Sequence, residues 1–245
     1  MPVTSLERPS RVNVPNIMPE YSPYHASVHK RGFDIATAKV VRGLTLIPEY
    51  CALLYLKRVL DDGEDYFSQV RDGVEIRKLR TMLNGEETQT VYSRDNPRIP
   101  SRGARLIREL RLDEVSQARL VADGAMSMVS YRPISGHYES DFREHLTPKQ
   151  FELWRWSRGE PVKPGAVSRA QVLTMSQETV DSEFIQQWFE EDVRHAREAS
   201  FGSDLGTLAL ATAVLLGHSA VQLGKPLQNM LRREVPQTSL PQNSK

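Results

Sequence analysis

The sequence predicts an α+β fold that is mostly helical, built as one domain with a small β-hairpin and a long amphipathic helix near its start. Apolar residues recur at helical spacing through most of the 245 residues, whereas one short stretch alternates between apolar and polar positions. An Asp-Gly pair divides that stretch, as in a two-residue hairpin turn. A chain of this length and composition suits one well-buried domain.

The long helix is expected in residues 29–60. Its apolar positions recur at intervals of three, four and seven: Phe33, Val40, Leu44, Ile47, Cys51 and Leu54. Lys39, Arg42 and Glu49 follow another stripe, and Pro48 removes one backbone donor, so we expect a kink there. Because no uncharged run reaches the ~20 residues that cross a bilayer, we expect this helix to lie on a membrane surface or on the protein.

The hairpin is expected in residues 66–82, where FSQVR and VEIRKLR flank Asp72-Gly73. Further helices are expected in residues 99–110, 114–122, 147–158, 181–199 and 204–217. Residues 205–223 contain no charged side chain, but Gly217 and the polar residues after it dilute the apolar run. That dilution favours a short helix, packed on the core or lying on a membrane surface, over a membrane span.

The two ends are expected to lie outside the folded domain. Prolines among polar residues oppose helix formation in residues 1–28, which predicts a disordered arm. Residues 224–245 have a similar composition and predict a disordered tail, which leaves residues 61–223 as the domain that follows the long helix. The first residues lack the charged-then-apolar order of a secretory signal, so export by that route is not predicted.

Charge and cysteine content exclude some classes of function. The formal net charge is +1, so the chain has no overall electrostatic footprint for nucleic acid, although arginines cluster between residues 94 and 119. Cys51 is the only cysteine, which excludes an internal disulfide and a multi-cysteine metal site and is compatible with a reducing cytoplasm.

Short motifs follow one another along most of the chain. They are KRGFD (30–34), YFSQVRDG (66–73), KLRTM (78–82), RDNPRIPSRGARLIRELRLDE (94–114), GAMSMVSYRP (124–133) and VKPG (162–165). In this order the chain resembles the bacterial sugar-transferase family, monotopic enzymes that move a sugar-1-phosphate from a nucleotide sugar to polyprenol phosphate. Each motif alone is weak, and the shared order and spacing carry the resemblance.

The resemblance assigns catalysis to the adjacent pair Asp113-Glu114. It implies that Asp113 attacks the β-phosphate of a UDP-sugar to form a covalent aspartyl phosphosugar, and that Glu114 helps to hold Mg²⁺. Polyprenol phosphate, with undecaprenyl phosphate as the expected form, would then accept the phosphosugar. Taken alone, an acidic pair beside a helix start is more often a solvated cap.

The same resemblance assigns the substrate phosphates to basic side chains. These are Arg108, Arg132, Lys78, Arg80 and Lys163. A guanidinium suits phosphate because its forked donors meet two oxygens at once. Lys78 and Arg80 would equally suit a charged strand edge, and Lys163 precedes a Pro-Gly turn of a common kind.

Several positions depart from the family pattern near the expected site. Ser116, Leu120 and Ala125 replace a proline, an asparagine and an aspartate, and Ser130-Tyr131 replaces Gly-Pro. A bulky Tyr131 would narrow a phosphate pocket if its ring pointed there. Two readings therefore stay open: a divergent transferase, or a catalytically silent relative that binds nucleotide sugar or scaffolds a partner.

The transferase reading carries expectations about place and partners. It implies peripheral or monotopic binding at the cytoplasmic face of the inner membrane, with the cytoplasm as second choice. The expected partners are a UDP-sugar, polyprenol phosphate and the membrane surface, with no nucleic acid and with a homodimer left open. The reaction would initiate exopolysaccharide or related glycan assembly.

Overall fold

The computed structural model describes residues 18–60, 63–84, 97–134, 136–174 and 181–233, with side chains in the last stretch described as far as residue 217. The expected arm up to residue 17, the last twelve residues of the expected tail and the start of the 94–114 motif lie outside these ranges. Within them, the mostly helical α+β fold with one small hairpin is confirmed.

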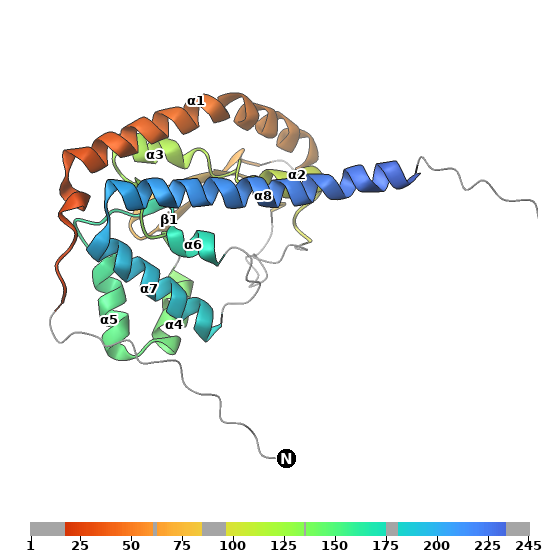
Figure 1. The fold of residues 1–245 in the computed structure, drawn as a ribbon. Coiled ribbons are helices and arrows are strands. Elements are labelled where there is room, and N and C mark those ends of the chain that lie inside the picture. Colours follow the sequence, from red (N-terminus) through yellow and green to blue (C-terminus); the bar gives the residue numbers. More distant parts are fainter. Residues whose placement is uncertain (1–17, 61–62, 85–96, 135, 175–180, 234–245) are drawn as a thin grey trace, which may run out of the picture.

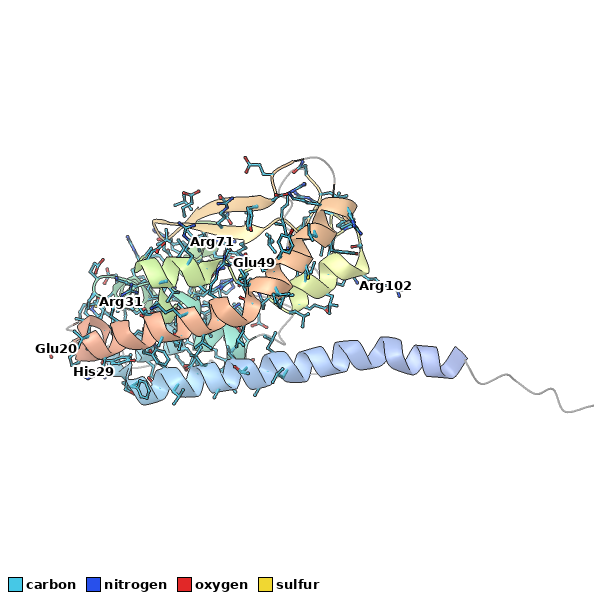
Figure 2. All side chains as sticks on the ribbon, turned by 90° about the horizontal axis from the view of Figure 1, so that it is seen from above. Glu20, His29, Arg31, Glu49, Arg71 and Arg102 are labelled. Atoms are coloured by element: carbon cyan, nitrogen blue, oxygen red, sulfur yellow. The ribbon has the colours of Figure 1, made fainter. Side chains whose placement is uncertain are left out.

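Helix α1 spans Val28–Val59, close to the predicted limits. The Ser27 side chain caps its start by accepting a hydrogen bond from the Lys30 amide. Pro48 lies inside the helix, as expected, and the ribbon changes direction close to Glu49 (Figure 2). Arg42 forms an ion pair with Glu49, so two of the charges that interrupt the helix in sequence neutralise each other.

The predicted apolar stripe of α1 points mainly to solvent. Phe33 is buried and contacts Phe201, the first residue of helix α8 (Phe201–Arg233), with ring centroids 5.5 Å apart. Val40, Leu44 and Ile47 are 60%, 74% and 75% exposed. The face turned to the protein carries a mixture of polar and apolar side chains, which includes Asp34, Ala38, Glu49, Ala52 and Leu56. Most of the stripe is therefore available for another apolar surface.

The hairpin is confirmed as strands β1 (Tyr66–Arg71) and β2 (Val74–Leu79), paired antiparallel with Arg71 opposite Val74. The two turn residues have left-handed backbone conformations, with φ of 45° at Asp72 and 75° at Gly73. Both values match a type I′ turn, which fits the right-handed twist of the two strands.

A second strand pair was not predicted. Strand β3 (Ser127–Val129) runs parallel to β4 (Gly165–Val167), with Ser127 opposite Gly165. A Cβ atom at Gly165 would lie 2.4 Å from the Ser130 backbone nitrogen, so only glycine permits this approach. The expected Pro-Gly loop thus ends in a strand that packs directly against the GAMSM motif.

The remaining helices follow the predicted order, with two additions. They are α2 (Arg102–Glu109), α3 (Gln117–Asp123), α4 (Gly136–His145), α5 (Pro148–Ser157), α6 (Arg169–Leu173), α7 (Ser182–Glu198) and α8 (Phe201–Arg233). Helices α4 and α6 were not predicted. Helix α8 is longer than the short helix expected in residues 204–217, and it also passes the boundary expected at residue 223, because the backbone stays helical through Arg233.

The core has separate parts on the two sides of the molecule. Figure 1 shows α1 and α8 along one side and α4, α5 and α7 on the other. The largest aromatic cluster lies among α4, α5 and α7 and includes Phe142, Phe151, Trp154 and Phe189. Two smaller clusters lie beneath α1, one with α3 and β3 and the other with β2 and α2.

Residues 18–27 correct part of the expected disordered arm. Tyr21 stacks on Trp156 with ring centroids 4.4 Å apart, and its hydroxyl donates to the Trp156 carbonyl oxygen at 2.6 Å. Ser22 is buried, and its hydroxyl donates to the carbonyl oxygen of Ala199 at 2.6 Å. Prolines oppose an α-helix but not the 3₁₀ turn Pro23–Ala26, so local composition did not predict these distant contacts.

Candidate active site

The acidic pair lies in the tight connection between α2 and α3. After α2 ends, Arg111 adopts a left-handed conformation with φ of 56°, and the Leu112 amide donates to the Ile107 carbonyl oxygen. The Asp113 carbonyl oxygen accepts a hydrogen bond from the Leu79 amide at 2.9 Å, which ties the pair to the end of β2. Asp113 is only 7% exposed, so the solvated-cap alternative does not hold.

Glu114 is the centre of a cluster of cations. Its Oε1 accepts hydrogen bonds from Lys78 Nζ at 2.7 Å and from Arg132 Nη2 at 2.6 Å, and Arg111 Nη1 lies 3.7 Å away. Burial alone would raise the pKa of Glu114, but Arg132, Lys78 and Arg111 outweigh burial and hold that pKa well below its usual range. Glu114 is therefore a carboxylate at neutral pH.

Asp113 has the opposite environment. Burial, reinforced by the neighbouring Glu114 charge, raises the pKa of Asp113 to about 6, although Lys78 and Arg108 oppose the change. Its Oδ1 is buried and has no hydrogen-bond partner. An unpartnered buried oxygen costs about 1–3 kcal/mol, so its presence marks Asp113 as a candidate for function rather than for stability.

Three of the five predicted phosphate-binding residues gather around this pair. Lys78 and Arg132 contact Glu114 directly, and Arg108 acts on Asp113 electrostatically while its Nη1 donates to the Thr81 hydroxyl at 3.0 Å. Burial lowers the pKa of Lys78, and Glu114 opposes that change. Lys78 is thus part of the site, and not simply a charge on a strand edge.

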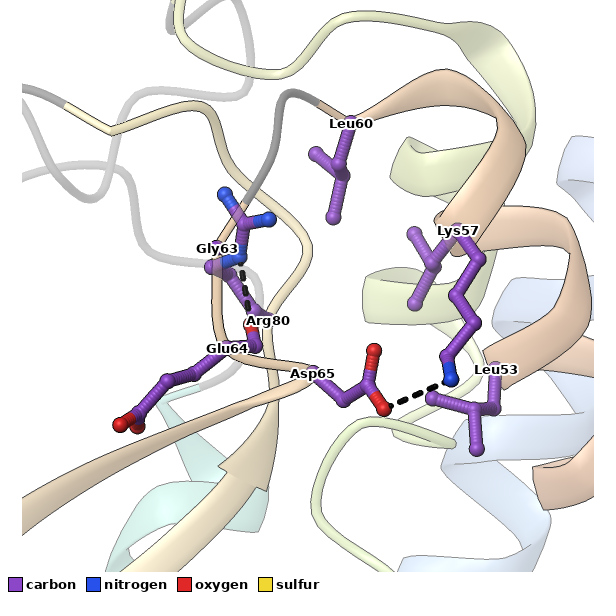
Figure 3. A pocket seen from close by; sticks show the side chains of 8 residues that line it. Leu53, Lys57, Leu60, Gly63, Glu64, Asp65 and Arg80 are labelled. Carbon is purple, nitrogen blue, oxygen red and sulfur yellow. Dashed lines mark hydrogen bonds and ion pairs between the residues drawn. The ribbon is translucent and has the colours of Figure 1, made fainter.

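Arg80 lines a different hollow, at the C-terminal end of α1. This pocket of about 200 Å³ is lined by Leu53, Leu56, Lys57, Leu60, Gly63, Glu64, Asp65 and Arg80, and includes neither acidic residue of the pair (Figure 3). Arg80 Nε donates to the Glu64 carbonyl oxygen at 2.8 Å, and Lys57 pairs with Asp65 at 2.9 Å. The predicted contact of Arg80 with substrate phosphates stays a prediction.

Lys163 closes the C-terminal end of α3. Its Nζ donates to the Gly124 carbonyl oxygen at 2.7 Å, and Arg31 donates to the carbonyl oxygens of Val121 and Ala122. Cations at a helix C-terminus satisfy carbonyls that have no partner within the helix. This arrangement gives Lys163 a structural role, and its predicted contact with substrate stays untested.

Tyr131 does not narrow the site by crowding the pair. Its side chain is buried with Val162 and Ala196, and the guanidinium of Arg158 lies over its ring at 4.3 Å. Sequence reasoning missed Arg111 and Arg158. Arg111 had a signal, since it is the third arginine within the eight residues before the pair, but no local pattern distinguishes Arg158 from the other arginines of the chain.

Comparison with known proteins agrees with this arrangement. The sequence profile of the bacterial sugar transferase family matches residues 25–218, which include α1, the acidic pair and the cations around it. The chain belongs to the bacterial sugar transferase family. That match extends over most of the chain, so the expectation drawn from the ordered motifs is confirmed.

Individual relatives of this sugar transferase have related names. It is 26% identical over 183 residues to the UDP-glucose:undecaprenyl-phosphate glucose-1-phosphate transferase of Escherichia coli K12, which covers 72% of this chain and 38% of that protein. It is 30% identical over 158 residues to the UDP-N-acetylgalactosamine-undecaprenyl-phosphate N-acetylgalactosaminephosphotransferase of Aeromonas hydrophila, covering 62% of this chain and 35% of that protein. The chain thus spans little more than a third of these two relatives.

A third relative is closer in length. The uncharacterized sugar transferase EpsL of Bacillus subtilis 168 is 30% identical over 162 residues, which cover 64% of this chain and 72% of that protein. In the stretches of this sugar transferase that the structure describes, no helix has both the length and the apolarity to cross a membrane.

Proposed function

We propose that this sugar transferase moves a sugar-1-phosphate from a UDP-sugar to a polyprenol phosphate, expected to be undecaprenyl phosphate, through a covalent intermediate on Asp113. One observation carries the proposal. Two adjacent buried carboxylates have pKa values shifted in opposite directions, and the unpartnered oxygen belongs to the one assigned as nucleophile. Adjacent carboxylates in contrasting environments are suited to different chemical roles.

The first step of this mechanism is attack by Asp113. A carboxylate oxygen of Asp113 bonds to the β-phosphorus of the donor, the bond from that phosphorus to the UMP oxygen breaks, and UMP leaves with the bonding electrons. In the second step an oxygen of polyprenol phosphate bonds to the same phosphorus, and the Asp113 carboxylate departs unchanged. The product is a polyprenol diphosphate sugar.

The cations would hold the donor in line for this attack. Arg132 and Lys78 come from different parts of the fold and meet at Glu114 Oε1, so their charges are fixed beside the nucleophile. Such preorganised charge stabilises a transferring phosphoryl group without reorganisation during reaction. Arg108 adds a third cation close to Asp113.

The carboxylates also fit a Mg²⁺ ion. The described residues hold no group of three potential metal ligands, but Mg²⁺ commonly uses one or two carboxylates together with substrate phosphates. Glu114, adjacent to the nucleophile, would help to hold the ion together with the phosphates of the donor. When bound, Mg²⁺ would shield the phosphate charge.

The exposed apolar stripe of α1 supports membrane association. Val40, Leu44, Ile47 and Leu54 face away from the protein, and Phe201, Leu205 and Leu216 of α8 are also exposed. These side chains would lie among lipid headgroups and the nearest acyl carbons, at the cytoplasmic face of the inner membrane, where a polyprenol acceptor resides. The reaction there would begin assembly of an exopolysaccharide or related glycan.

The second candidate is a catalytically silent relative that binds nucleotide sugar or scaffolds a partner. The hydrogen bonds from Lys78 and Arg132 to Glu114 favour this candidate. They neutralise part of the positive charge that a transferase would direct at the phosphates of its substrate. The two candidates differ in the first half-reaction, because only the transferase forms an adduct without acceptor.

The test is the mass of the intact protein after incubation with a UDP-sugar and Mg²⁺. Donors should include UDP-glucose and UDP-N-acetylgalactosamine, which appear in the names of the relatives. We expect release of UMP and a mass increase of one phosphosugar, mapped to Asp113 and absent in Asp113→Asn. Asp113→Asn should be at least as stable as the wild type, because the buried carboxylate is penalised by its surroundings. The protein is a silent relative if it binds the donors but forms neither an adduct nor UMP with any of them, even in lipid that contains polyprenol phosphate.

A further inference from the structure

A second charged cluster contacts the backbone of Arg132, whereas Glu114 contacts its side chain. Its centre is Arg158, the C-cap of α5, whose side chain is only 7% exposed. The guanidinium donates to Asp72 Oδ2 at 2.7 Å, to Asp192 Oδ2 at 2.8 Å and to the Arg132 carbonyl oxygen at 2.8 Å. The rings of Tyr131 and Trp154 lie 4.3 and 4.7 Å from it.

Asp72 makes a second bond to the same segment. It lies in the hairpin turn, and its Oδ2 also accepts a hydrogen bond from the Ile134 amide at 3.1 Å. The backbone is therefore held on both sides of Pro133, by Arg158 at the Arg132 carbonyl and by Asp72 at the Ile134 amide. Residues 130–134 belong to no helix or strand. The Ser130 amide donates to the Val167 carbonyl oxygen and the Tyr131 carbonyl oxygen accepts from the Gly165 amide, so Arg158 and Asp72 restrain the part that follows, residues 132–134.

The restrained segment carries the arginine that contacts Glu114. Arg132 Nη2 donates to Glu114 at 2.6 Å, and its Nη1 donates to the Ala166 carbonyl oxygen of β4 at 3.1 Å. The direction of that side chain depends on where its backbone is fixed. A shift of about 1 Å in such a group can cost about a hundredfold in rate.

We propose that Asp72 and Arg158 are positioning residues for phosphosugar transfer, which hold the backbone of residues 132–134 so that the Arg132 guanidinium stays directed at Glu114. This inference rests on the proposed function. It assigns a role in the reaction to the tip of the β-hairpin, where none of the predicted catalytic or phosphate-binding residues lies.

A purely structural role for Arg158 would give a different pattern. Asp192 is also bonded to Trp154 Nε1, at 3.2 Å, and joins α5 to α7 inside the aromatic core. Asp72 is 28% exposed at a hairpin tip, where loss of a charge pair costs little stability. If Arg158 serves stability alone, substituting Asp192 should lower both the unfolding midpoint and the rate of adduct formation, whereas substituting Asp72 should change neither substantially.

The experiment compares variants of the full-length chain in the first half-reaction. The variants are Asp72→Ala, Asp72→Asn, Arg158→Lys and Asp192→Asn, with Glu75→Gln as a matched control that removes an exposed carboxylate from the same hairpin. At saturating UDP-sugar and Mg²⁺, we expect Asp72→Ala to slow adduct formation by about tenfold or more, by loss of Arg132 alignment. Asp72→Asn and Arg158→Lys each keep part of the bonding and should be intermediate.

Stability is measured on the same samples by denaturant unfolding. Asp72→Ala should lower the midpoint only slightly, because alanine is disfavoured in the left-handed turn conformation of residue 72, and Asp192→Asn should lower the midpoint more than it lowers the rate. Glu75→Gln should change neither property. A wild-type rate in Asp72→Ala, or a rate that falls only with the folded fraction in every variant, would overturn the inference.

Hydrogen exchange supplies a readout that does not depend on activity. In Asp72→Ala the Ile134 amide loses its acceptor, so peptides covering residues 130–134 should exchange faster while those from α7 stay unchanged. Unchanged exchange at residues 130–134 would also overturn the positioning role. An active wild type with unaffected variants refutes this inference alone, whereas a wild type that forms no adduct refutes the proposed function as well.

Discussion

Two of the buried charge clusters in the described residues differ in how completely their polar atoms are paired. In the first, Lys30 binds Asp204 and the Val129 carbonyl oxygen, and Asp34 accepts hydrogen bonds from the Ser127 hydroxyl and the Met128 amide. In the second, Glu114 is paired, but Oδ1 of the adjacent Asp113 has no partner.

The difference separates stability from chemistry. A buried charge that is paired and hydrogen-bonded fixes elements relative to one another, and Lys30 does this for α1, β3 and α8. A buried carboxylate left without a partner destabilises the fold and is retained where a reaction needs it. Both clusters begin from family motifs, so motif membership alone does not distinguish the two roles.

The largest expected effect is on the stability of the paired cluster. Lys30→Met keeps the length of the side chain but removes the ammonium group that Asp34 and Asp204, both nearly inaccessible to solvent, share. We expect the free energy of unfolding to fall by about 3–5 kcal/mol, measured by denaturant titration.

Lys39→Met is the matched control for this change, since Lys39 is an exposed lysine of the same helix. It should change the free energy of unfolding by less than about 0.5 kcal/mol. Similar values for the two variants would show that the cluster does not stabilise α1.

The next largest effect is the pH dependence of adduct formation and of stability, both through Asp113. Because the pKa of Asp113 is raised to about 6, the nucleophile is protonated below that pH, and adduct formation should rise as pH increases through about 6. Stability should move the other way: the contribution of Asp113 is fully present below its ordinary pKa of 3.8 and is lost as pH rises through about 6.

Rates of UMP release and unfolding midpoints, measured at several pH values between 4 and 8, should show these opposite trends. In Asp113→Asn the loss of stability that Asp113 causes as pH rises through about 6 should disappear. A rate that is flat across pH 6, or one that falls there, would contradict the role assigned to Asp113.

The smallest expected effect concerns the outer face of α1, which lies away from both clusters. Ile47→Glu places a charge in the exposed apolar stripe and should weaken cosedimentation with anionic phospholipid vesicles by about tenfold, from lost burial of one large apolar side chain. Val28→Glu, at an exposed apolar position outside that stripe, should bind like the wild type. Equal binding by both variants would exclude the stripe as the lipid contact.

Local patterns in the sequence predicted those parts of the fold that local physics determines. The hairpin followed from Asp72-Gly73, and the limits of α1 followed from apolar spacing. The direction of the α1 stripe did not, because periodicity identifies an apolar face without saying what covers it. Strands β3 and β4 are three residues long and pair across 38 positions, which is too short and too distant for a pattern to reveal.

The candidate site was predicted through ordered motifs rather than through chemistry visible in the sequence. Asp113, Glu114, Lys78, Arg108 and Arg132 were all anticipated by resemblance, and the structure brings them together. Lys163 matches the family motif too, but its described contact is with the end of α3, so its predicted contact with substrate stays a prediction. Arg158 shows the converse, since its role arises from tertiary contacts that leave no local signal.

The contacts of Tyr21 and Ser22 impose an order on folding. Ser22 bonds to Ala199, 177 positions later, so the segment before α1 has no place to dock until most of the chain has left the ribosome. Contacts of such sequence separation form slowly. During synthesis the apolar stripe of α1 is therefore exposed long before the start of that helix is fastened, and a membrane or a chaperone would meet it first.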